Sequence, residues 1–146
     1  MAEIRFHHIS LTCREPLAVE RFYTTHFGFI RARVVDIGGG GQIVFLRNRE
    51  MYLELFQATA DAPVAPAEGD GYPWPSVRNF SFMVDDVDRK LAEMGSAAVV
   101  AFGPLAFDSF IPGWKSVWLR DPDGRLVQIT QGFGDELCPP PLPTSP

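Results

Sequence analysis

The stretch R-F-H-H-I-S-L-T-C, residues 5–13, decides the fold, because R-N-F-S-F-M-V at residues 78–84 repeats its pattern. In the first stretch Ile9, Leu11 and Cys13 alternate with polar side chains, which is typical of a strand with one apolar face. The second stretch alternates in the same phase. Both lead into a segment with helical spacing, so they predict two equivalent strand-helix units.

Superimposing the two stretches places polar side chains at matched positions. His8 falls on Asn79, and Ser10 falls on Ser81. Self-similarity of this kind is the signature of a duplicated structural unit. We therefore expect two half-domains built on one plan.

Length and charge limit the class of protein. The chain has 146 residues and a net charge of -5, which fits one domain or two small halves that share a core. It has no basic stripe, so a nucleic-acid partner is not expected. It has no apolar run long enough to cross a bilayer and no signal pattern at its start. These features predict a cytoplasmic protein with a small-molecule partner and no membrane partner.

The two cysteines do not make a disulfide framework. Cys13 lies in a predicted strand, whereas Cys138 lies in a proline-rich tail. Cys13 shares the apolar face of its strand with Leu11. A free cysteine in that position behaves as a small apolar side chain, so we interpret Cys13 as a packing residue and not as a nucleophile.

The first half of the chain predicts a strand, a helix and three further strands. Pro16 suits the first turn of a helix, where its missing N–H costs nothing, and Gly28 ends that helix. The glycines at residues 38–41 predict a hairpin tip, because a strand and not a helix follows them. The strands expected after the helix are residues 29–36, 42–46 and 51–57.

The second half repeats this order. Asp121-Pro122-Asp123-Gly124 predicts a tight hairpin turn that makes Trp118 a neighbour of Gln128. The expected elements are strands at 78–84, 97–102, 115–120 and 126–130, a helix at 87–94 and a loop at 103–113. The predicted organisation is a first module at 4–57, a linker at 58–77, a second module at 78–132 and a proline-rich tail at 133–146.

Glu54 is the exceptional residue of the apolar strand M-Y-L-E-L-F-Q. A carboxylate is rarely left inside a sheet without a partner, so its face is solvated or a cationic group meets it. In the repeat Glu54 falls on Gln128, and the polar faces of the outer strands therefore carry, at equivalent points, His8, Glu54, Asn79 and Gln128. His7 is expected on the opposite face from His8, where we interpret it as structural.

The ordered set F-H-H-I-S-L, E-R-F-Y, Y-L-E-L and W-L-R-D-P-D-G-R-L-V-Q-I resembles the vicinal oxygen chelate superfamily. That superfamily includes glyoxalase I, methylmalonyl-CoA epimerase, extradiol dioxygenases, fosfomycin-resistance enzymes and bleomycin-binding proteins. The resemblance spans residues 4–132. It implies an α+β fold in which two βαβββ modules curl a mixed sheet around a cavity, with the helices outside, and it implies a homodimer.

The resemblance also implies a metal site with two altered positions. Metal-binding members carry His or Glu ligands on the first and last strands of each module, and these positions are His8, Glu54, Asn79 and Gln128 in this chain. The first two match, whereas amides replace the histidine and the glutamate expected at the last two. Asn79 is too short to be a ligand. The implied site is therefore a divalent ion (Ni, Zn, Mn or Fe) held by His8, Glu54 and Gln128.

Three functions remain open at this point. With a metal, the resemblance implies a glyoxalase- or epimerase-like lyase or isomerase that acts on a small oxygen-rich metabolite, with Glu54 as the catalytic residue, in preference to a dioxygenase. Without a metal, Glu54 acts alone as a general base. The third function is sequestration of a small molecule without catalysis, as in bleomycin-binding members.

All three functions use the same predicted cavity. The loop at 103–113 would be its lid. Whether one chain completes the cavity, or two chains share it, is left open by the sequence. The side chains expected to line it are Ser10, Tyr52, Phe56, Asn79, Ser81, Phe107, Phe110, Trp114 and Trp118.

Overall fold

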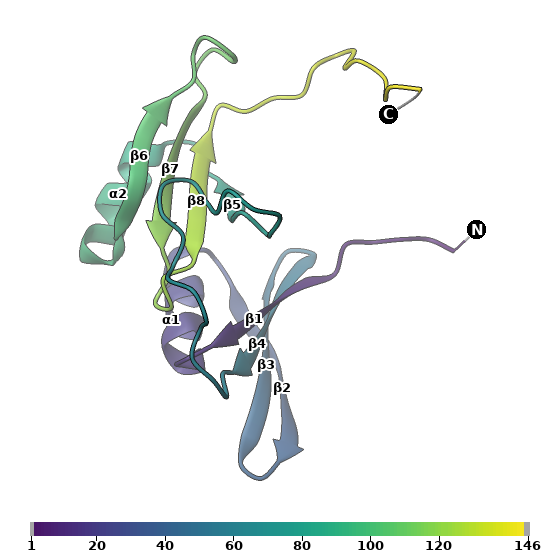
Figure 1. Ribbon diagram of the computed structural model, residues 1–146, viewed down its shortest axis with the longest axis vertical. Coiled ribbons are helices and arrows are strands. Elements are labelled where there is room, and N and C mark those ends of the chain that lie inside the picture. Colours follow the sequence, from purple (N-terminus) through teal and green to yellow (C-terminus); the bar gives the residue numbers. More distant parts are fainter. Residues whose placement is uncertain (1, 145–146) are drawn as a thin grey trace.

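The computed structural model describes residues 2–144, which form two four-stranded sheets with helices packed against them (Figure 1). The first sheet has the strand order β1-β4-β3-β2, in which β1 is parallel to β4 and the other pairs are antiparallel. Its module consists of β1 (His8–Cys13), α1 (Pro16–His26), β2 (Ile30–Gly38), β3 (Gly41–Asn48) and β4 (Met51–Gln57).

The second sheet repeats the first, with the order β5-β8-β7-β6 and a parallel β5-β8 pair. Its module consists of β5 (Phe80–Met83), α2 (Val87–Met94), a 3-10 turn (Gly95–Ala97), β6 (Val100–Ala106), β7 (Lys115–Arg120) and β8 (Leu126–Gln131). The α+β class and the two βαβββ modules are confirmed. The eight strands make two separate sheets.

The predicted loop at 103–113 is partly wrong, because residues 103–106 continue β6. The 3-10 turn after α2 delays the start of this strand from Ala97 to Val100. Pro104 is accommodated because β6 is an edge strand and its register with β7 shifts between Phe102 and Leu105. The lid predicted for the cavity is therefore shorter.

Both helices begin and end as their sequences predict. Pro16 occupies the first turn of α1. The Asp86 side chain accepts a hydrogen bond from the Arg89 backbone N–H at 2.9 Å, which caps α2, and Gly95 follows with a φ of 56°. Within residues 2–144, no helix has the length and apolarity needed to cross a membrane.

The apolar faces of both sheets pack into one shared core. Leu53 and Leu55 of the first sheet and Val117 and Ile129 of the second belong to the same buried cluster. Because side chains alternate along a strand, the opposite face of each sheet points away from this core. We call these outward surfaces the polar face of the first sheet and the polar face of the second sheet.

Aromatic side chains join the two modules inside this core. The Phe27 and Phe82 rings lie 4.6 Å apart between their centroids, and Tyr23 of α1 lies 5.9 Å from Phe80 of β5. Contacts between aromatic rings add to the free energy gained by burying them. Helix α1 therefore packs on its own sheet and on the first strand of the other module.

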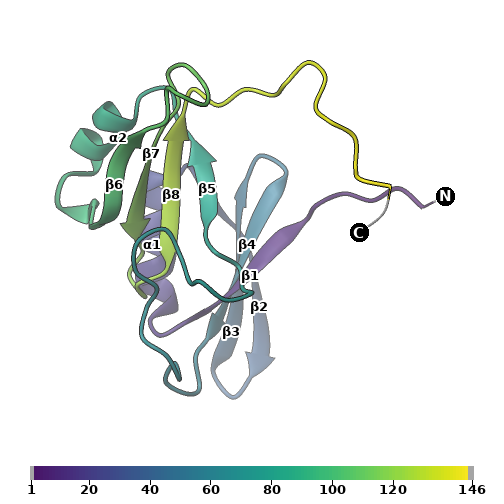
Figure 2. The same ribbon diagram turned by 45° about the horizontal axis from the view of Figure 1, so that its top comes forward.

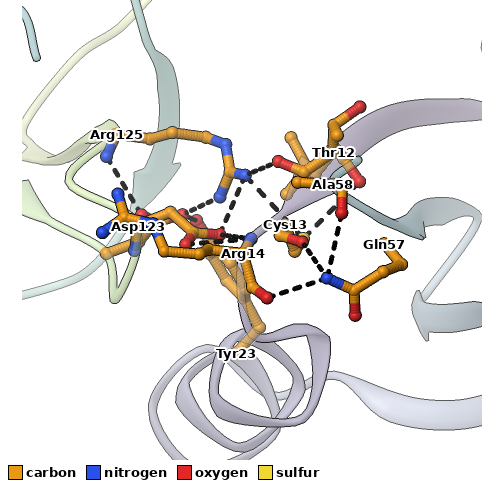
Figure 3. Close-up of polar contacts among 10 residues, drawn as sticks. Thr12, Cys13, Arg14, Tyr23, Gln57, Ala58, Asp123 and Arg125 are labelled. Carbon is orange, nitrogen blue, oxygen red and sulfur yellow. Dashed lines mark hydrogen bonds and ion pairs between the residues drawn. The ribbon is translucent and has the colours of Figure 1, made fainter. Parts of the chain in front are cut away.

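A buried polar network also fastens the modules together (Figure 3). Arg125 follows the β7-β8 turn and pairs with the fully buried Asp121 carboxylate at 2.6 Å. Its other terminal nitrogen donates to the Thr12 carbonyl of β1. The Asp123 carboxylate accepts a hydrogen bond from the Arg14 backbone N–H at 3.1 Å. The hairpin turn of the second module thus binds the end of β1.

Tyr23 completes the network from α1. Its hydroxyl donates to the Asp121 carboxylate at 3.0 Å. Burial raises the pKa of Tyr23 well above its ordinary value, and the nearby Asp121 charge adds to the shift. The hydroxyl therefore remains a donor at every physiological pH.

The linker between the modules covers the polar face of the second sheet. Figures 1 and 2 both show it crossing in front of β8 on its way from β4 to β5. Ala67 and Tyr72 of the linker pack there on Trp118 and Leu126. In the tail, residues 133–144 form no helix or strand, and residues 145–146 of the predicted tail lie outside the described residues.

We predict that Arg125→Met lowers the free energy of unfolding by about 3–5 kcal/mol, because it leaves the Asp121 carboxylate buried without its cation. Urea denaturation measures the change. The matched control is Arg89→Met, whose exposed pairs with Asp85 and Glu93 predict a change within about 0.5 kcal/mol. Equal effects of the two substitutions would contradict a stabilising role for the network.

The Cys13 thiol provides a second prediction. Burial raises its pKa from 9.0 to about 11, and its side chain is fully buried. We expect iodoacetamide at pH 8 to label Cys138 and to leave Cys13 unmodified until the protein unfolds.

Because the pKa of Cys13 is higher in the folded protein than in the unfolded chain, the stabilisation from this thiol is complete below pH 9 and is lost as the pH rises through about 11. Cys13→Ala should therefore make stability less dependent on pH in that range.

Candidate functional site

Three polar side chains from β1 and β4 meet on the polar face of the first sheet. The Ser10 hydroxyl donates to the Glu54 carboxylate at 2.5 Å, and His8 Nε2 lies 3.2 Å from the same oxygen. The parallel pairing of β1 with β4 explains the meeting, because Ser10 is the register partner of Glu54 and His8 that of Tyr52. The predicted approach of an imidazole and a carboxylate from distant parts of the chain is confirmed.

His7 also belongs to this cluster, and its expected position on the opposite face is wrong. Its Nδ1 lies 2.8 Å from His8 Nδ1, and its ring stacks on Tyr52 with 4.8 Å between centroids. Strand β1 begins only at His8, so the alternation of a regular strand does not govern the residue before it. Tyr52 is the register partner of His8, so it lies next to the position that a continued strand would pair with His7. This aromatic residue was the sequence signal that could have indicated the contact.

The contacts of the two histidines define a consistent proton arrangement. If both rings are neutral, His7 Nδ1–H donates to His8 Nδ1, and the His8 proton lies on Nε2, beside the Glu54 carboxylate. Glu54 accepts a hydrogen bond from the Ser10 hydroxyl and has the His8 ring as a close neighbour. Its side chain is only 15% exposed, so these two neighbours replace much of the water that a free carboxylate would bind.

The polar face of the second sheet carries a mainly aromatic set. Gln128 lies between its register partners Ser81 and Trp118. Phe107 packs on Trp114, with 4.9 Å between ring centroids, and lies 6.4 Å from Trp118. The Trp118 indole N–H is buried and has no hydrogen-bond partner among the described residues. Phe110, which was expected in the same wall, is 77% exposed.

Asn79 serves the linker in this structure. Its side-chain nitrogen donates to the Asp70 carbonyl at 3.4 Å. Beside it, Arg78 pairs with the Asp70 carboxylate at 2.8 Å. These contacts hold the linker across the second sheet, where Tyr72 packs against the buried cluster of Ala67, Trp118 and Leu126.

The predicted site residues therefore form two groups. His8, Ser10 and Glu54 share the first polar face with Tyr52 and Phe56, and the second polar face carries Ser81, Gln128, Phe107, Trp114 and Trp118. Within residues 2–144, no hydrogen bond or salt bridge connects one group with the other.

The donor set available to a metal ion is correspondingly small. His8 Nε2 and Glu54 Oε2 lie 3.2 Å apart, a spacing that two ligands of one ion would have. Across the described part of the chain, however, no group of three or more His, Cys, Asp or Glu side chains is arranged to hold a metal. Catalytic zinc sites use three protein ligands, so the residues that this chain brings together do not fit one.

A cavity of about 630 Å³ lies between the end of β1 and the linker. Its lining includes Thr12, Arg14 and Arg125 and the linker residues Val64 and Tyr72. Its volume is within the range of small-molecule sites. It does not include His8 or Glu54.

Comparison with known proteins gives the family. The sequence profile of the Glyoxalase/Bleomycin resistance protein/Dioxygenase superfamily matches residues 5–129. The chain belongs to this superfamily. A sequence search of curated proteins returned no match. Superfamily membership agrees with the two βαβββ modules and with the resemblance found in the sequence.

Solved structures of similar fold include a glyoxalase/dioxygenase from Nostoc punctiforme, which is 20% identical with a TM-score of 0.67 and covers 89% of this chain and 92% of that chain. Lactoylglutathione lyase from Agrobacterium tumefaciens is 24% identical, with a TM-score of 0.55 and coverage of 90% and 96%. TnmS3, an antibiotic binding protein from a Streptomyces strain, is 20% identical, with a TM-score of 0.60 and coverage of 91% and 99%. At these identities the likeness shows the superfamily fold alone.

We predict that Tyr72→Ala detaches the linker and exposes Trp118, because Tyr72 is the large linker side chain in that cluster. In a background with Trp74→Phe and Trp114→Phe, Trp118 is the remaining tryptophan. Acrylamide should then quench its fluorescence more strongly after Tyr72→Ala. Pro73→Ala, at an exposed neighbouring position, is the control and should change little. Unchanged quenching in Tyr72→Ala would contradict the covering role of the linker.

Proposed function

We propose that this member of the superfamily is a glyoxalase- or epimerase-like enzyme that uses Glu54 as a general base on a small oxygen-rich metabolite. The observation that supports it is the partly buried Glu54 carboxylate, held by Ser10 at 2.5 Å and His8 at 3.2 Å on an open sheet face. A base must be fixed in position to reach a substrate proton. The hydrogen bond from Ser10 and the contact with His8, both on the neighbouring strand β1, provide this positioning.

The proposed reaction is proton transfer next to a carbonyl group. Glu54 takes the proton from the carbon, and the C–H electron pair forms the double bond of an enolate whose oxygen becomes negative. Glu54 is then neutral, and the neighbouring His8 Nε2–H stabilises that oxygen. Return of the proton from Glu54 to the other face of the same carbon completes an epimerisation. For an α-hydroxy carbonyl compound, return of the proton to the former carbonyl carbon, together with transfer of the hydroxyl proton to the enolate oxygen, completes an isomerisation.

The reaction is proposed to proceed without a resident metal ion. His8 and Glu54 are two donors, and Asn79, the expected third position, binds the linker through its nitrogen. Gln128 contacts neither of them within residues 2–144. The proposal therefore assigns to Glu54 and His8 the roles of base and oxyanion donor, which need no third ligand.

Sequestration of a small molecule is the second candidate function. The cavity of about 630 Å³ beside the linker supports it, and so does the aromatic group around Trp118, whose indole N–H is buried without a partner. TnmS3, which has the same fold, is an antibiotic binding protein. This function would need no contribution from Glu54.

We also propose that the protein is a homodimer. The first polar face is open in the single chain: His8 and Ser10 are exposed. Apolar side chains nearby are exposed as well, such as Ile30 at 54% and Phe6 at 68%. A second copy would exclude water from the Glu54 cluster and would bury these side chains. Sedimentation equilibrium measures the mass in solution, and a strictly monomeric protein would contradict this assembly.

We predict that Glu54→Gln lowers the rate of proton abstraction by about 100-fold or more, because it removes the base and keeps the shape of the side chain. The assay is loss of the α-proton NMR signal in D2O for a panel of small α-oxygenated carbonyl compounds. Glu50→Gln, at an exposed position of the β3-β4 turn, is the matched control and should retain the rate.

Treatment with a chelator separates the proposal from its metal-dependent form. We expect EDTA and dialysis to leave the exchange rate unchanged, since neither Glu54 nor His8 is assigned to a metal. Loss of exchange that one equivalent of Ni, Zn, Mn or Fe restores would show that a metal takes part. Absence of exchange with tight ligand binding would favour sequestration.

A further inference from the structure

We propose that the ligand of the first polar face is an anion, carrying a carboxylate or a phosphate that Arg33 and Arg47 bind. This inference rests on the proposed function, because it names the substrate class of the same surface. It follows from strand register, from the lack of side-chain partners for the two arginines among residues 2–144, and from the charge of the face. None of these observations depends on the catalytic role of Glu54.

Strand register places both arginines on the same face as Glu54. Phe45 of β3 pairs with Glu54 of β4, and Arg33 of β2 pairs with Phe45. Arg47 pairs with Tyr52, two residues from Glu54 on the same strand. The intervening Leu46 and Leu53 are fully buried in the core, which fixes the other set on the outer face.

Both guanidinium groups are available to a ligand. Arg33 and Arg47 are exposed, and the structure shows no salt bridge or side-chain hydrogen bond for either within residues 2–144. Arg31 provides the contrast: it lies on the core side of β2, where it pairs with Glu20 of α1 at 2.5 Å. Within the described residues, Arg31 therefore pairs with a carboxylate of α1, whereas Arg33 and Arg47 on the outer face pair with none.

The charge of this face is opposite to that of the whole protein. Two arginines and one glutamate give the face a formal charge of +1, whereas the chain carries -5. A positive surface on an acidic protein attracts anions selectively. Arginine also presents a planar fork of donors that matches carboxylate and phosphate oxygens, which favours those groups over halide-like ions.

The spacing of the groups suits a substrate with an anionic end and a reactive carbon. Neighbouring strands lie about 4.8 Å apart, so Arg33, two strands from Glu54, is separated from it by about 10 Å along the sheet. Phe45 fills the space between them, and its ring lies 6.3 Å from that of His8. An acid with a short apolar or planar middle would therefore place its anion on Arg33 and Arg47, its middle on Phe45, and its acidic C–H at Glu54.

Binding of small probes to the full chain tests the inference. Phenylacetate and phenyl phosphate are the anions, and phenylacetamide is the neutral compound of similar shape. NMR titration of the 15N-labelled protein gives each Kd. Loss of one charge-assisted contact predicts that the anions bind at least about tenfold more tightly than the amide. The preference should shrink as salt increases from about 50 mM to about 400 mM. If phenylacetate has the lower Kd, the site prefers a carboxylate; if phenyl phosphate has the lower Kd, it prefers a phosphate.

Paired variants assign the effect to the two arginines. In the Arg33→Gln, Arg47→Gln double variant the anion preference should fall below about threefold, and Arg33→Lys with Arg47→Lys should keep most of it. Arg21→Gln removes an exposed arginine of α1, outside this face, and should leave every Kd unchanged. An anion preference that survives the double Gln variant would overturn the inference.

The outcomes separate this inference from the proposed function. If the anions bind through the arginines but Glu54→Gln changes no exchange rate, the base role is wrong and the anion site stands. If Glu54-dependent exchange is the same for neutral and anionic compounds, the anion site is wrong and the base role stands. If the anions do not bind, and the double Gln variant dissociates a dimer, acidic side chains of a second copy occupy the arginines, which also overturns the inference.

Discussion

The arrangement of the two modules depends on one buried carboxylate. Asp121 has no exposed side-chain surface; its charge is balanced by Arg125 at 2.6 Å, and its carboxylate accepts a hydrogen bond from the Tyr23 hydroxyl at 3.0 Å. A charge in that environment must be paired, because desolvation alone would cost several kcal/mol. Its partners lie on α1 and on the hairpin turn that binds the end of β1. The requirement to satisfy Asp121 therefore fixes how the modules sit against each other.

This docking directs the apolar face of each sheet into a common core and leaves both polar faces outside. The two polar faces then differ. The linker covers the second one, where Tyr72 packs against the cluster that contains Trp118 and Asn79 binds the Asp70 carbonyl. The first one stays open and carries the Glu54 cluster. The two modules have the same order of elements but different surfaces, because the single linker between them covers only the second sheet.

The chemistry of the open face depends on which of the four equivalent positions of the repeat carry an imidazole or a carboxylate. His8 and Glu54 remain an imidazole-carboxylate pair, whereas Asn79 and Gln128 are amides that face the linker and an aromatic wall. The pair is supported from within its own module by Ser10 and His7. Arg33 and Arg47 then give the same face a positive charge. The proposed base and the proposed anion site are both built from the first module.

Alternation of apolar and polar residues predicted most of the strands and, together with the repeat, the meeting of His8 with Glu54, because period-two patterning decides which side chains share a face. Helical spacing, Pro16 and Gly28 predicted the helices, whereas the bounds of β6 were not predicted correctly. The repeat was sufficient to predict the family fold. Only tertiary structure decided the position of His7, which precedes the regular part of β1, and the path of residues 58–77, which have no periodicity. It also decided that Asn79 contacts the linker, since long-range packing of an irregular segment leaves no pattern in the sequence.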